Sequence, residues 1–369
     1  MDRSPPAAFP EFPIPKGAIP DVSIIVPARN EEANIAGCLK SLTFQTGVAF
    51  EIIVVDDGST DRTREIARSF AGVHVISPEA APQGWTGKNN AVVAGASQAR
   101  ADWLLFTDAD TVHLPGSLAR ALEEARNEGA DLLSYSPQQV VVTFAERAVM
   151  PVIFAELAAQ YPPRTVREQN SEVVAANGQY ILVRREAYDD AGGHAAVATE
   201  ILEDVALARR FRNAGKRVHF RYGEEAVRTR MYRSWAQLRE GWTKNLALLF
   251  PHPDRLVLQS LFRWLIAWSA LALAAFGAAS RHFAWIALAA LWLWLYWRIS
   301  TANFATLNNL IAIAFGPPIL AYLLRRSKQA HERGQVSWKG RAYDVGPQSG
   351  SKPAASQAAK PILRTERPN

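Results

Sequence analysis

The alternation of short apolar runs with helical stretches, between Val22 and Phe106, most restricts how this chain can fold. The runs are VSIIV (22–26), EIIVV (51–55), VHVI (73–76) and WLLF (103–106). Helical patterns lie between them, such as the one through Ile35 and Leu42. Buried strands that alternate with helices form a mostly parallel sheet with helices on both faces. We therefore expect an α/β domain over residues 21–231, without internal repeats.

Three strongly apolar stretches follow this domain, with Trp and Tyr near their ends. They lie at about 256–279, 283–300 and 303–324. Each approaches the roughly 20 residues that cross a bilayer. The alternative, a buried soluble core, would need a further domain to cover so many apolar side chains. The sequence therefore predicts transmembrane or re-entrant C-terminal helices over residues 253–325.

The third stretch differs from the other two because polar and helix-breaking residues interrupt it. Asn308 and Asn309 are polar, and the Gly-Pro-Pro at 316–318 suits a kinked or re-entrant segment. Basic residues follow over 325–341, and the positive-inside tendency assigns them to the cytosol. No apolar signal segment precedes residue 256, so the α/β domain is expected on the same side. These features predict two full spans and one re-entrant segment in a multi-pass inner-membrane protein.

The residues 232–252 have the pattern of an amphipathic helix that lies in the membrane interface. Five apolar side chains recur there at helical spacing: Trp235, Leu238, Trp242, Leu246 and Leu249. Arg233, Arg239 and Lys244 lie largely on the other sides of the helical wheel. Such a helix binds a membrane surface or packs against the α/β domain, and the pattern alone does not choose between these two positions.

Composition indicates the type of partner and the compartment. The formal net charge is +6, but the basic residues are densest beside and after the apolar stretches. Anionic lipid is therefore the expected partner, and nucleic acid is not. The single cysteine, Cys38, lies in a helical run and is expected to be buried in a reduced, cytosol-facing domain. Residues 1–20 predict a Pro-rich extended arm, and residues 326–369 predict a basic, partly disordered tail.

The first two strands end in polar segments. VPARNEE (26–32) has no glycine, which argues against a dinucleotide-binding loop and hence against a nicotinamide oxidoreductase. DDGSTD (56–61) follows the second strand, at the edge where open α/β sheets bind ligands. Its carboxylates can accept hydrogen bonds from a base or a ribose. The alternative is a simple turn in which Asp61 caps the next helix.

Two further carboxylates follow the strand that ends in WLLFTDAD. Asp108 and Asp110 are two residues apart, so an extended chain directs both to the same side. Mg²⁺ or Mn²⁺ uses one or two carboxylates together with phosphate oxygens. The pair therefore predicts a divalent-metal site that neutralises a diphosphate, although such a pair is also common in solvated turns.

Five segments together resemble the family 2 glycosyltransferases of GT-A fold. In order, they are VPARNEE, DDGSTD, GWTGKNNA, TDADT and EILEDVALARRFRNAGKRV. The resemblance covers about residues 21–250 and implies a nucleotide-diphosphate sugar, most simply a UDP-sugar, as donor. It implies that Asp108 and Asp110 bind the metal and that Lys88 binds the diphosphate, a role suited to a point positive charge. The residues implied to bind the nucleotide sugar are Pro27, Arg29, Glu31, Asp56, Asp57, Lys88 and Asp108.

The same resemblance implies that Asp204 is the general base of an inverting transfer. A carboxylate must take the proton of the acceptor hydroxyl while its oxygen attacks the anomeric carbon. The alternative is that Glu203 and Asp204 only favour the N-terminus of the helix that ends near Gly215. His113 lies near the Asp pair, where a structural hydrogen bond is the simpler role.

Residues 230–235 resemble the (Q/R)xxRW element of lipid-glycosylating and processive relatives, with one residue inserted before Trp235. This departure weakens any prediction of processive polymer synthesis. Possible contacts to the acceptor or the diphosphate are assigned to Glu203, Arg230, Arg233 and Trp242.

The order of segments along the chain, including Trp338-Lys339-Gly340-Arg341, most closely resembles bacterial glycosyltransferases associated with hopanoid and carotenoid glycosylation. It implies a lipid acceptor and a role in glycolipid biosynthesis. Two alternatives stay open: a processive membrane polysaccharide synthase, and a non-catalytic membrane protein that binds nucleotide sugars.

Overall fold

The structure is a computed structural model that describes residues 12–15, 17–277, 282–338 and 341–344. Most of the expected arm and the tail from residue 345 lie outside the described residues, as do Lys339 and Gly340 of the segment 338–341. In the described part of the arm, Phe12 stacks on Phe50 with 5.0 Å between the ring centroids.

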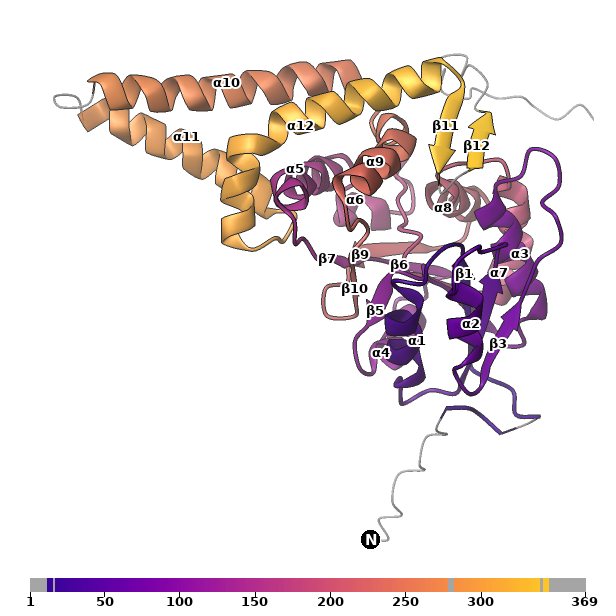
Figure 1. The fold of residues 1–369 in the computed structure, drawn as a ribbon. Coiled ribbons are helices and arrows are strands. Elements are labelled where there is room, and N and C mark those ends of the chain that lie inside the picture. Colours follow the sequence, from indigo (N-terminus) through magenta and orange to yellow (C-terminus); the bar gives the residue numbers. More distant parts are fainter. Residues whose placement is uncertain (1–11, 16, 278–281, 339–340, 345–369) are drawn as a thin grey trace, which may run out of the picture.

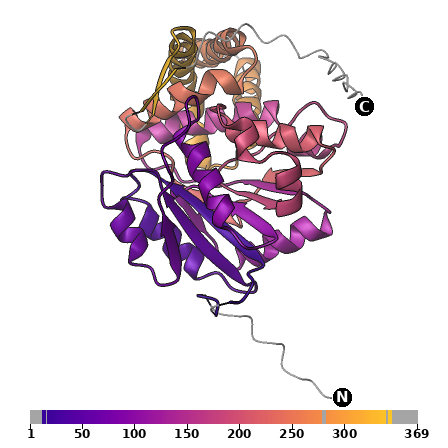
Figure 2. The same cartoon turned by 90° about the vertical axis from the view of Figure 1, so that its right-hand side faces the viewer.

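A seven-stranded sheet forms the centre of the first domain (Figures 1 and 2). In spatial order its strands are β3 (Val73–Ile76), β2 (Phe50–Asp56), β1 (Val22–Ala28), β4 (Trp103–Phe106), β8 (Ile181–Arg184), β6 (Leu132–Ser136) and β9 (Val218–Tyr222). Only β8 is antiparallel to its neighbours, β4 and β6. The mostly parallel α/β sheet expected from the sequence is therefore confirmed, and the four predicted strands are β1 to β4.

Helices cover both faces of this sheet because successive strand residues point to opposite sides. Ile24 and Val26 of β1 face one core, and Ile25 faces the other. The first face is covered by α1 (Ile35–Thr43), α2 (Thr63–Arg68) and α4 (Ser117–Asn127). The second is covered by α3 (Gly87–Gln98), α7 (Arg185–Asp190), the short η1 (His194–Val197) and α8 (Glu203–Asn213). Cys38 is buried in the first core, as predicted.

A smaller sheet lies at the edge of the domain. It contains β5 (Thr111–His113), β10 (Val227–Thr229) and β7 (Gln138–Gln139) in that order. The strand β5 begins at Thr111, directly after Asp108 and Asp110, and pairs with β10. This pairing fixes the chain at the C-terminal end of the turn that carries the two aspartates.

Five of the remaining helices that the structure describes build a third core beside the sheet. They are α5 (Phe144–Gln160), α9 (Trp235–Leu249), α10 (Pro253–Gly277), α11 (His282–Ser300) and α12 (Thr306–Glu332). The short α6 (Pro163–Arg167) packs against β9 instead. We call α10, α11 and α12 the C-terminal layer. This layer lies at the end of the molecule opposite residue 12, and a hairpin of β11 (Gln335–Trp338) and β12 (Arg341–Asp344) follows it (Figure 1).

Helix α12 packs along the first domain. It contacts α5, α9 and α10, and its Gly316 lies so close to α5 that a Cβ would collide with the Ala148 carbonyl. The ion pairs of Glu156 in α5 with Arg263 and Arg298 also attach α10 and α11 to the domain, at 3.2 and 2.6 Å. The C-terminal layer is therefore joined to α5 both by close packing and by paired charges.

The segment expected to dip into the membrane and return is instead part of one continuous helix. Helix α12 carries Pro317 and Pro318 in its interior and changes direction along its length (Figure 1). The expected boundary at residue 325 falls inside it. Among the described residues, α12 alone has the length and mean hydropathy (1.6) of a membrane-crossing helix, and 44% of its apolar window is buried in the protein.

Helix α9 has the middle of its apolar face covered by protein, whereas Trp235 at its start is exposed. Leu238, Trp242 and Leu246 are buried in the core that α5 and α12 share. Of the two positions that the pattern allowed, the packing of α9 corresponds to the one against the α/β domain.

Candidate active site

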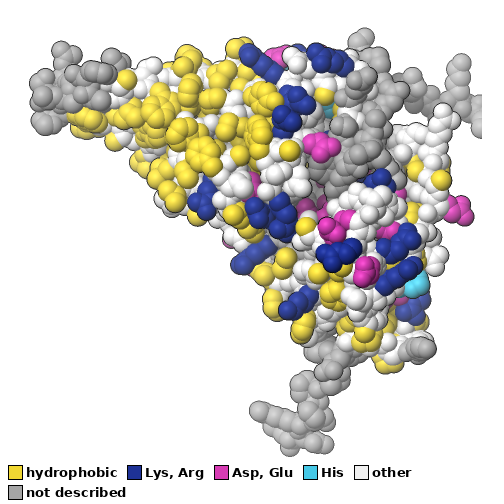
Figure 3. Space-filling view, viewed as in Figure 1, with side chains coloured by type: hydrophobic (Ala, Val, Ile, Leu, Met, Phe, Trp, Pro, Cys, Tyr) yellow, Lys and Arg dark blue, Asp and Glu magenta, His cyan; other side chains and the backbone are white. Residues whose placement is uncertain are grey.

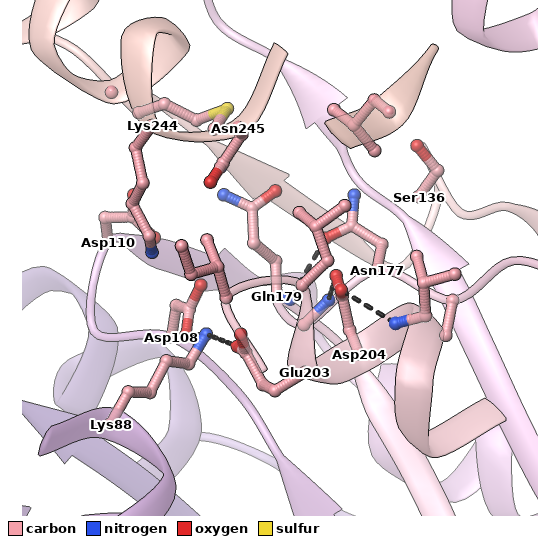
Figure 4. Close-up of a pocket in the computed structure, with 18 of the residues that line it drawn as sticks. Lys88, Asp108, Asp110, Ser136, Asn177, Gln179, Glu203, Asp204, Lys244 and Asn245 are labelled. Carbon is pink, nitrogen blue, oxygen red and sulfur yellow. Dashed lines mark hydrogen bonds and ion pairs between the residues drawn. The ribbon is translucent and has the colours of Figure 1, made fainter. Parts of the chain in front are cut away.

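A cavity of about 300 Å³ opens at the carboxyl ends of β1, β2 and β4 (Figure 4). Parallel strands bring the residues that follow them to one edge of a sheet, so segments far apart in sequence meet there. Ten of the thirteen predicted site residues line this cavity: Pro27, Arg29, Glu31, Asp57, Lys88, Asp108, Asp110, Glu203, Asp204 and Trp242. Asp56, Arg230 and Arg233 do not.

Asp56 lies beneath the cavity rather than in its wall. It is fully buried, and its carboxylate accepts hydrogen bonds from Arg64 Nε at 2.7 Å and from the Ser59 N–H at 3.3 Å. Arg29 reaches the same loop and donates to the Asp57 carbonyl at 2.5 Å. Asp56 therefore shapes the loop that brings Asp57 into the cavity wall.

Lys88 bridges two carboxylates at the centre of the cavity (Figure 4). Its Nζ lies 2.8 Å from Asp108 Oδ1 and 2.7 Å from Glu203 Oε1. The lysine sits in the first turn of α3, where Thr86 accepts the Asn89 N–H at 3.1 Å. Burial works against the charged ammonium, but Asp108 and Glu203 outweigh it and raise the pKa of Lys88 well above its ordinary value. Lys88 is thus a fixed positive charge.

Asp108 and Asp110 provide hard oxygen donors at the end of β4. The turn that carries them is held by Thr111, whose hydroxyl donates to the Asp108 carbonyl at 2.8 Å. The described residues contain no group of three or more His, Cys, Asp or Glu that could hold a metal alone. Two carboxylates completed by substrate phosphates are a usual Mg²⁺ arrangement, so the donor set fits a divalent cation that binds together with a diphosphate.

Asp204 lies in the first turn of α8 and faces the same cavity. Its Oδ2 accepts the Gly178 N–H at 2.9 Å, and its Oδ1 accepts the Val205 N–H at 2.8 Å. Burial, aided by the negative charge of Glu203, raises the pKa of Asp204 to about 6. A carboxylate with this pKa is ionised at neutral pH and more basic than an ordinary aspartate, as a general base requires.

The neighbouring carboxylate behaves in the opposite way. Burial alone would raise the pKa of Glu203, but Lys88 and then Lys244 lower it below its ordinary value. Adjacent carboxylates whose pKa values are pushed apart commonly have different roles in one site. Here Glu203 holds the lysines, and Asp204 is left as the basic group.

The other half of the cavity is apolar. Tyr161, which follows α5, donates its hydroxyl to the Leu249 carbonyl at 2.8 Å and so ties α5 to the end of α9. Trp242 packs edge-on against Phe154 with 6.2 Å between the ring centroids. The apolar wall includes Phe154, Leu157, Ala158, Tyr161, Ile201, Leu202, Phe220, Met231, Tyr232, Trp242 and Leu249.

Arg230 and Arg233 make contacts outside the cavity. Arg230 pairs with Glu146 of α5 at 3.3 Å. Arg233 donates to Asn34 Oδ1 at 2.7 Å and to the Ala33 carbonyl at 3.2 Å. Both arginines therefore connect the segment before α9 to other elements.

His113 is also structural in its contacts. Its Nε2 lies 3.1 Å from Thr107 Oγ1 in the buried region behind the Asp pair, and burial lowers its pKa to about 3. It is therefore neutral at physiological pH.

Among the cavity residues that the sequence analysis did not assign to the site, two lie beside the predicted carboxylates and lysine. Lys244 was grouped with the arginines on the polar side of α9, yet it lines the cavity (Figure 4). Gly178 looked like an ordinary loop glycine, but a Cβ there would lie 3.1 Å from Lys88 Nζ and 3.5 Å from Asp204 Oδ2. The polar NGQ run at 177–179, directly before β8, was the available signal for Gly178. No local pattern marks Lys244.

The chain is similar in sequence to known glycosyltransferases. Residues 23–192 match the family model described as Glycosyl transferase family 2. The 4,4'-diaponeurosporenoate glycosyltransferase of Staphylococcus haemolyticus (strain JCSC1435) is 30% identical over 338 residues, which cover 88% of each chain. The enzyme of the same name from Staphylococcus aureus (strain USA300) is 28% identical over 343 residues, with the same coverage. Among solved structures, the mannosyltransferase PcManGT from Pyrobaculum calidifontis in complex with GDP-Man and Mn²⁺ has a TM-score of 0.48 and 19% identity, covering 89% of this chain and 90% of that one.

Proposed function

The chain belongs to glycosyltransferase family 2, and from this premise we propose that it transfers a sugar, with inversion, from a UDP-sugar to the hydroxyl of a membrane lipid. Family membership itself makes it a glycosyltransferase of GT-A fold that uses nucleotide sugars. One observation carries the finer proposal. A single cavity has a charged half at the strand ends and an apolar half beside α5 and α9. Asp204 is part of the wall of this same cavity.

The charged half suits the donor. Pro27 near the end of β1, Arg29 and Glu31 after it and Asp57 after β2 are available to a nucleoside, while Lys88 is available to its diphosphate. A divalent cation, Mg²⁺ or Mn²⁺, bound by Asp108 and Asp110 would supply neutralising charge for that diphosphate.

The apolar half suits the acceptor. A lipid whose apolar body lies along α5 and α9 would present its terminal hydroxyl to Asp204. The curated relatives are named for 4,4'-diaponeurosporenoate, a carotenoid acid, which supports an acceptor with a long apolar body. The hydroxyl as attacking group is part of the present proposal and does not come from that name.

The chain's own groups then account for the reaction. Asp204 takes the proton of the acceptor hydroxyl, and the acceptor oxygen forms a bond to the anomeric carbon. The bond between that carbon and the diphosphate oxygen breaks on the opposite face, so the configuration inverts. Lys88 holds the departing diphosphate with a charge-assisted contact.

The C-terminal layer suits a membrane surface. Its outer side exposes a broad apolar face in which Lys and Arg side chains lie at the border (Figure 3). The exposed large apolar side chains of this layer include Leu258, Phe262, Leu265, Ile266, Trp268, Trp285, Ile286, Leu293, Trp294, Trp297, Leu307, Leu310 and Phe315. At the end of α12, Arg325 and Arg326 are exposed, where anionic headgroups would meet them.

The packing favours insertion from one side over the multi-pass topology expected from the sequence. Helix α12 lies against α5 and α9, so it cannot cross a bilayer without drawing part of the α/β domain into the lipid. We therefore infer that the C-terminal layer enters the cytosolic leaflet of the inner membrane, as amphipathic surfaces do. In vesicle flotation with anionic phospholipid, Phe262→Asp together with Leu265→Asp is expected to abolish binding. Binding that survives this double change would contradict the proposed face.

A transfer assay tests the function as a whole. Purified protein is incubated with radiolabelled UDP-glucose or UDP-N-acetylglucosamine, Mn²⁺ and a total membrane-lipid extract. The expected product is a labelled lipid of low molecular mass. A long labelled polymer would support a processive synthase instead, and nucleotide-sugar binding without transfer would support a non-catalytic protein.

A further inference from the structure

Lys244 is a positive charge that enters the active site from the side opposite the sheet. It lies in the middle of α9, and its side chain points toward Asp110 and Asp108 (Figure 4). Lys88 pairs with Asp108 from the first turn of α3. Two lysines from different cores therefore flank the Asp108–Asp110 pair.

The charges around the cavity show what a second lysine can do there. The acidic residues that line the cavity are Glu31, Asp57, Asp108, Asp110, Glu203 and Asp204, and the basic ones are Arg29, Lys88 and Lys244, so acidic residues exceed basic ones by three. One divalent cation offsets two of these negative charges. When the sugar leaves a nucleoside diphosphate, the diphosphate gains one further negative charge, which fixed cations nearby stabilise. A lysine in this position therefore stabilises the diphosphate more strongly as the bond to the sugar breaks.

The backbone of α9 is held in place on both sides of Lys244 by α12. The Ser327 hydroxyl donates to the Thr243 carbonyl at 2.8 Å and accepts the Ala247 N–H at 2.9 Å, so it is inserted between two groups that would normally bond to each other. His331 Nε2 lies 2.9 Å from the Lys244 carbonyl. Ser327 is fully buried. These contacts fix the position of the α9 backbone from which the Lys244 side chain extends.

We propose that Lys244 is a second diphosphate-binding residue, which α9 presents to the donor across the cavity from Lys88. This inference rests on the proposed function, since it presumes a nucleoside-diphosphate donor. The competing explanation is that Lys244 only balances buried carboxylates and supports folding. The two explanations differ in whether the phosphates of the ligand matter.

Binding of UDP and of uridine, both measured by calorimetry with Mg²⁺ present, separates them. For Lys244→Ala we expect the affinity for UDP to fall about tenfold or more, the usual size of a lost charge-assisted hydrogen bond. The affinity for uridine, which has no phosphates, should not change. Lys244→Met keeps most of the side-chain volume and provides a second variant if the alanine protein does not fold. Arg239→Ala is the matched control, because it removes a positive charge from the same helix outside the cavity wall.

Each outcome has one meaning. Equal UDP affinity in wild type and folded Lys244 variants would overturn the proposal, as would a parallel loss of UDP and uridine affinity. If the wild-type protein binds uridine no more weakly than UDP, or binds neither, the proposed donor itself is wrong.

Discussion

The two halves of the cavity are built in different ways. The donor side of the charged half comes from residues at or just after the ends of β1, β2 and β4 and from Lys88 in the first turn of α3, all within the first 110 residues. The apolar half takes its side chains from α5, the residues before α8, β9 and α9, between residues 154 and 249. The first half is specified locally by strand ends, and the second by tertiary packing. A single substitution should therefore affect the donor or the acceptor, but not both.

The largest effect is expected in the charged half. Asp110→Ala removes one chelating arm and its charge together, so turnover should fall by about a thousandfold or more. Titration with UDP-sugar and Mn²⁺ should show loss of the metal-dependent part of the affinity. Uridine affinity serves as the control and should stay the same. Unchanged turnover and affinity would remove the metal assignment.

The next effect lies where the halves meet. Asp204→Asn should lower turnover about a hundredfold while leaving UDP-sugar affinity nearly intact, because general-base contributions are of that size. The amide oxygen can still accept the Gly178 N–H, so the local structure is kept. If affinity collapses in step with turnover, Asp204 is structural.

The pH dependence sharpens the same assignment. A base must be deprotonated to act, and the pKa of Asp204 is raised to about 6. Wild-type turnover should therefore rise as the pH increases through about 6 and level off above it. The Asp204→Asn protein should lack this step. If the turnover of the variant also rises near pH 6, the titrating group is not Asp204.

A smaller effect is expected in the apolar half. Leu157→Ala removes apolar contact from the wall, which should raise the KM for the lipid acceptor roughly tenfold. The KM for the donor should not change. Val142→Ala, at an exposed position outside the cavity, is the matched control. Equal changes in both KM values would show that the halves are not separable.

The smallest catalytic effect is expected at Arg230, which belongs to neither half. Its partner Glu146 keeps the N–H groups of Val142 and Thr143, so Arg230→Ala should lower the free energy of unfolding by only about 1 kcal/mol. Turnover should stay within about twofold. Urea unfolding and the transfer assay measure the two quantities. A large fall in turnover at unchanged stability would return Arg230 to the diphosphate site.

The local origin of the charged half explains how much the sequence could predict. The strands at 22–28, 50–56, 73–76 and 103–106 follow the apolar runs, and the residues after them reach one edge by the geometry of a parallel sheet. The antiparallel insertion of β8 between β4 and β6 had no such signal. Gly178 and the N–H that it donates to Asp204 depend on that insertion, so they were missed.

The C-terminal helices show a different limit. Their apolar composition predicted helices correctly, but it does not tell whether lipid or protein covers a given face. For α12, the contact of Gly316 with Ala148 shows that protein covers this face, because the backbones of α12 and α5 approach closely there. Lys244 was missed for the same reason, because a helical wheel does not show which neighbour each side meets.

The close approach of α12 to α5 also determines where this enzyme can be divided. Cutting the chain after α9 would remove the cover from the apolar side of α5, where Val149, Val152 and Ile153 are buried together with residues of α12. The fragment that remains would keep every strand end of the donor site and yet expose the apolar face of α5 to solvent. Such a fragment should aggregate rather than behave as a soluble catalytic domain. Tags and fusion partners therefore belong beyond β12 or before residue 12. Detergent should be present when the protein is extracted from the membrane, because the C-terminal layer then loses its lipid cover.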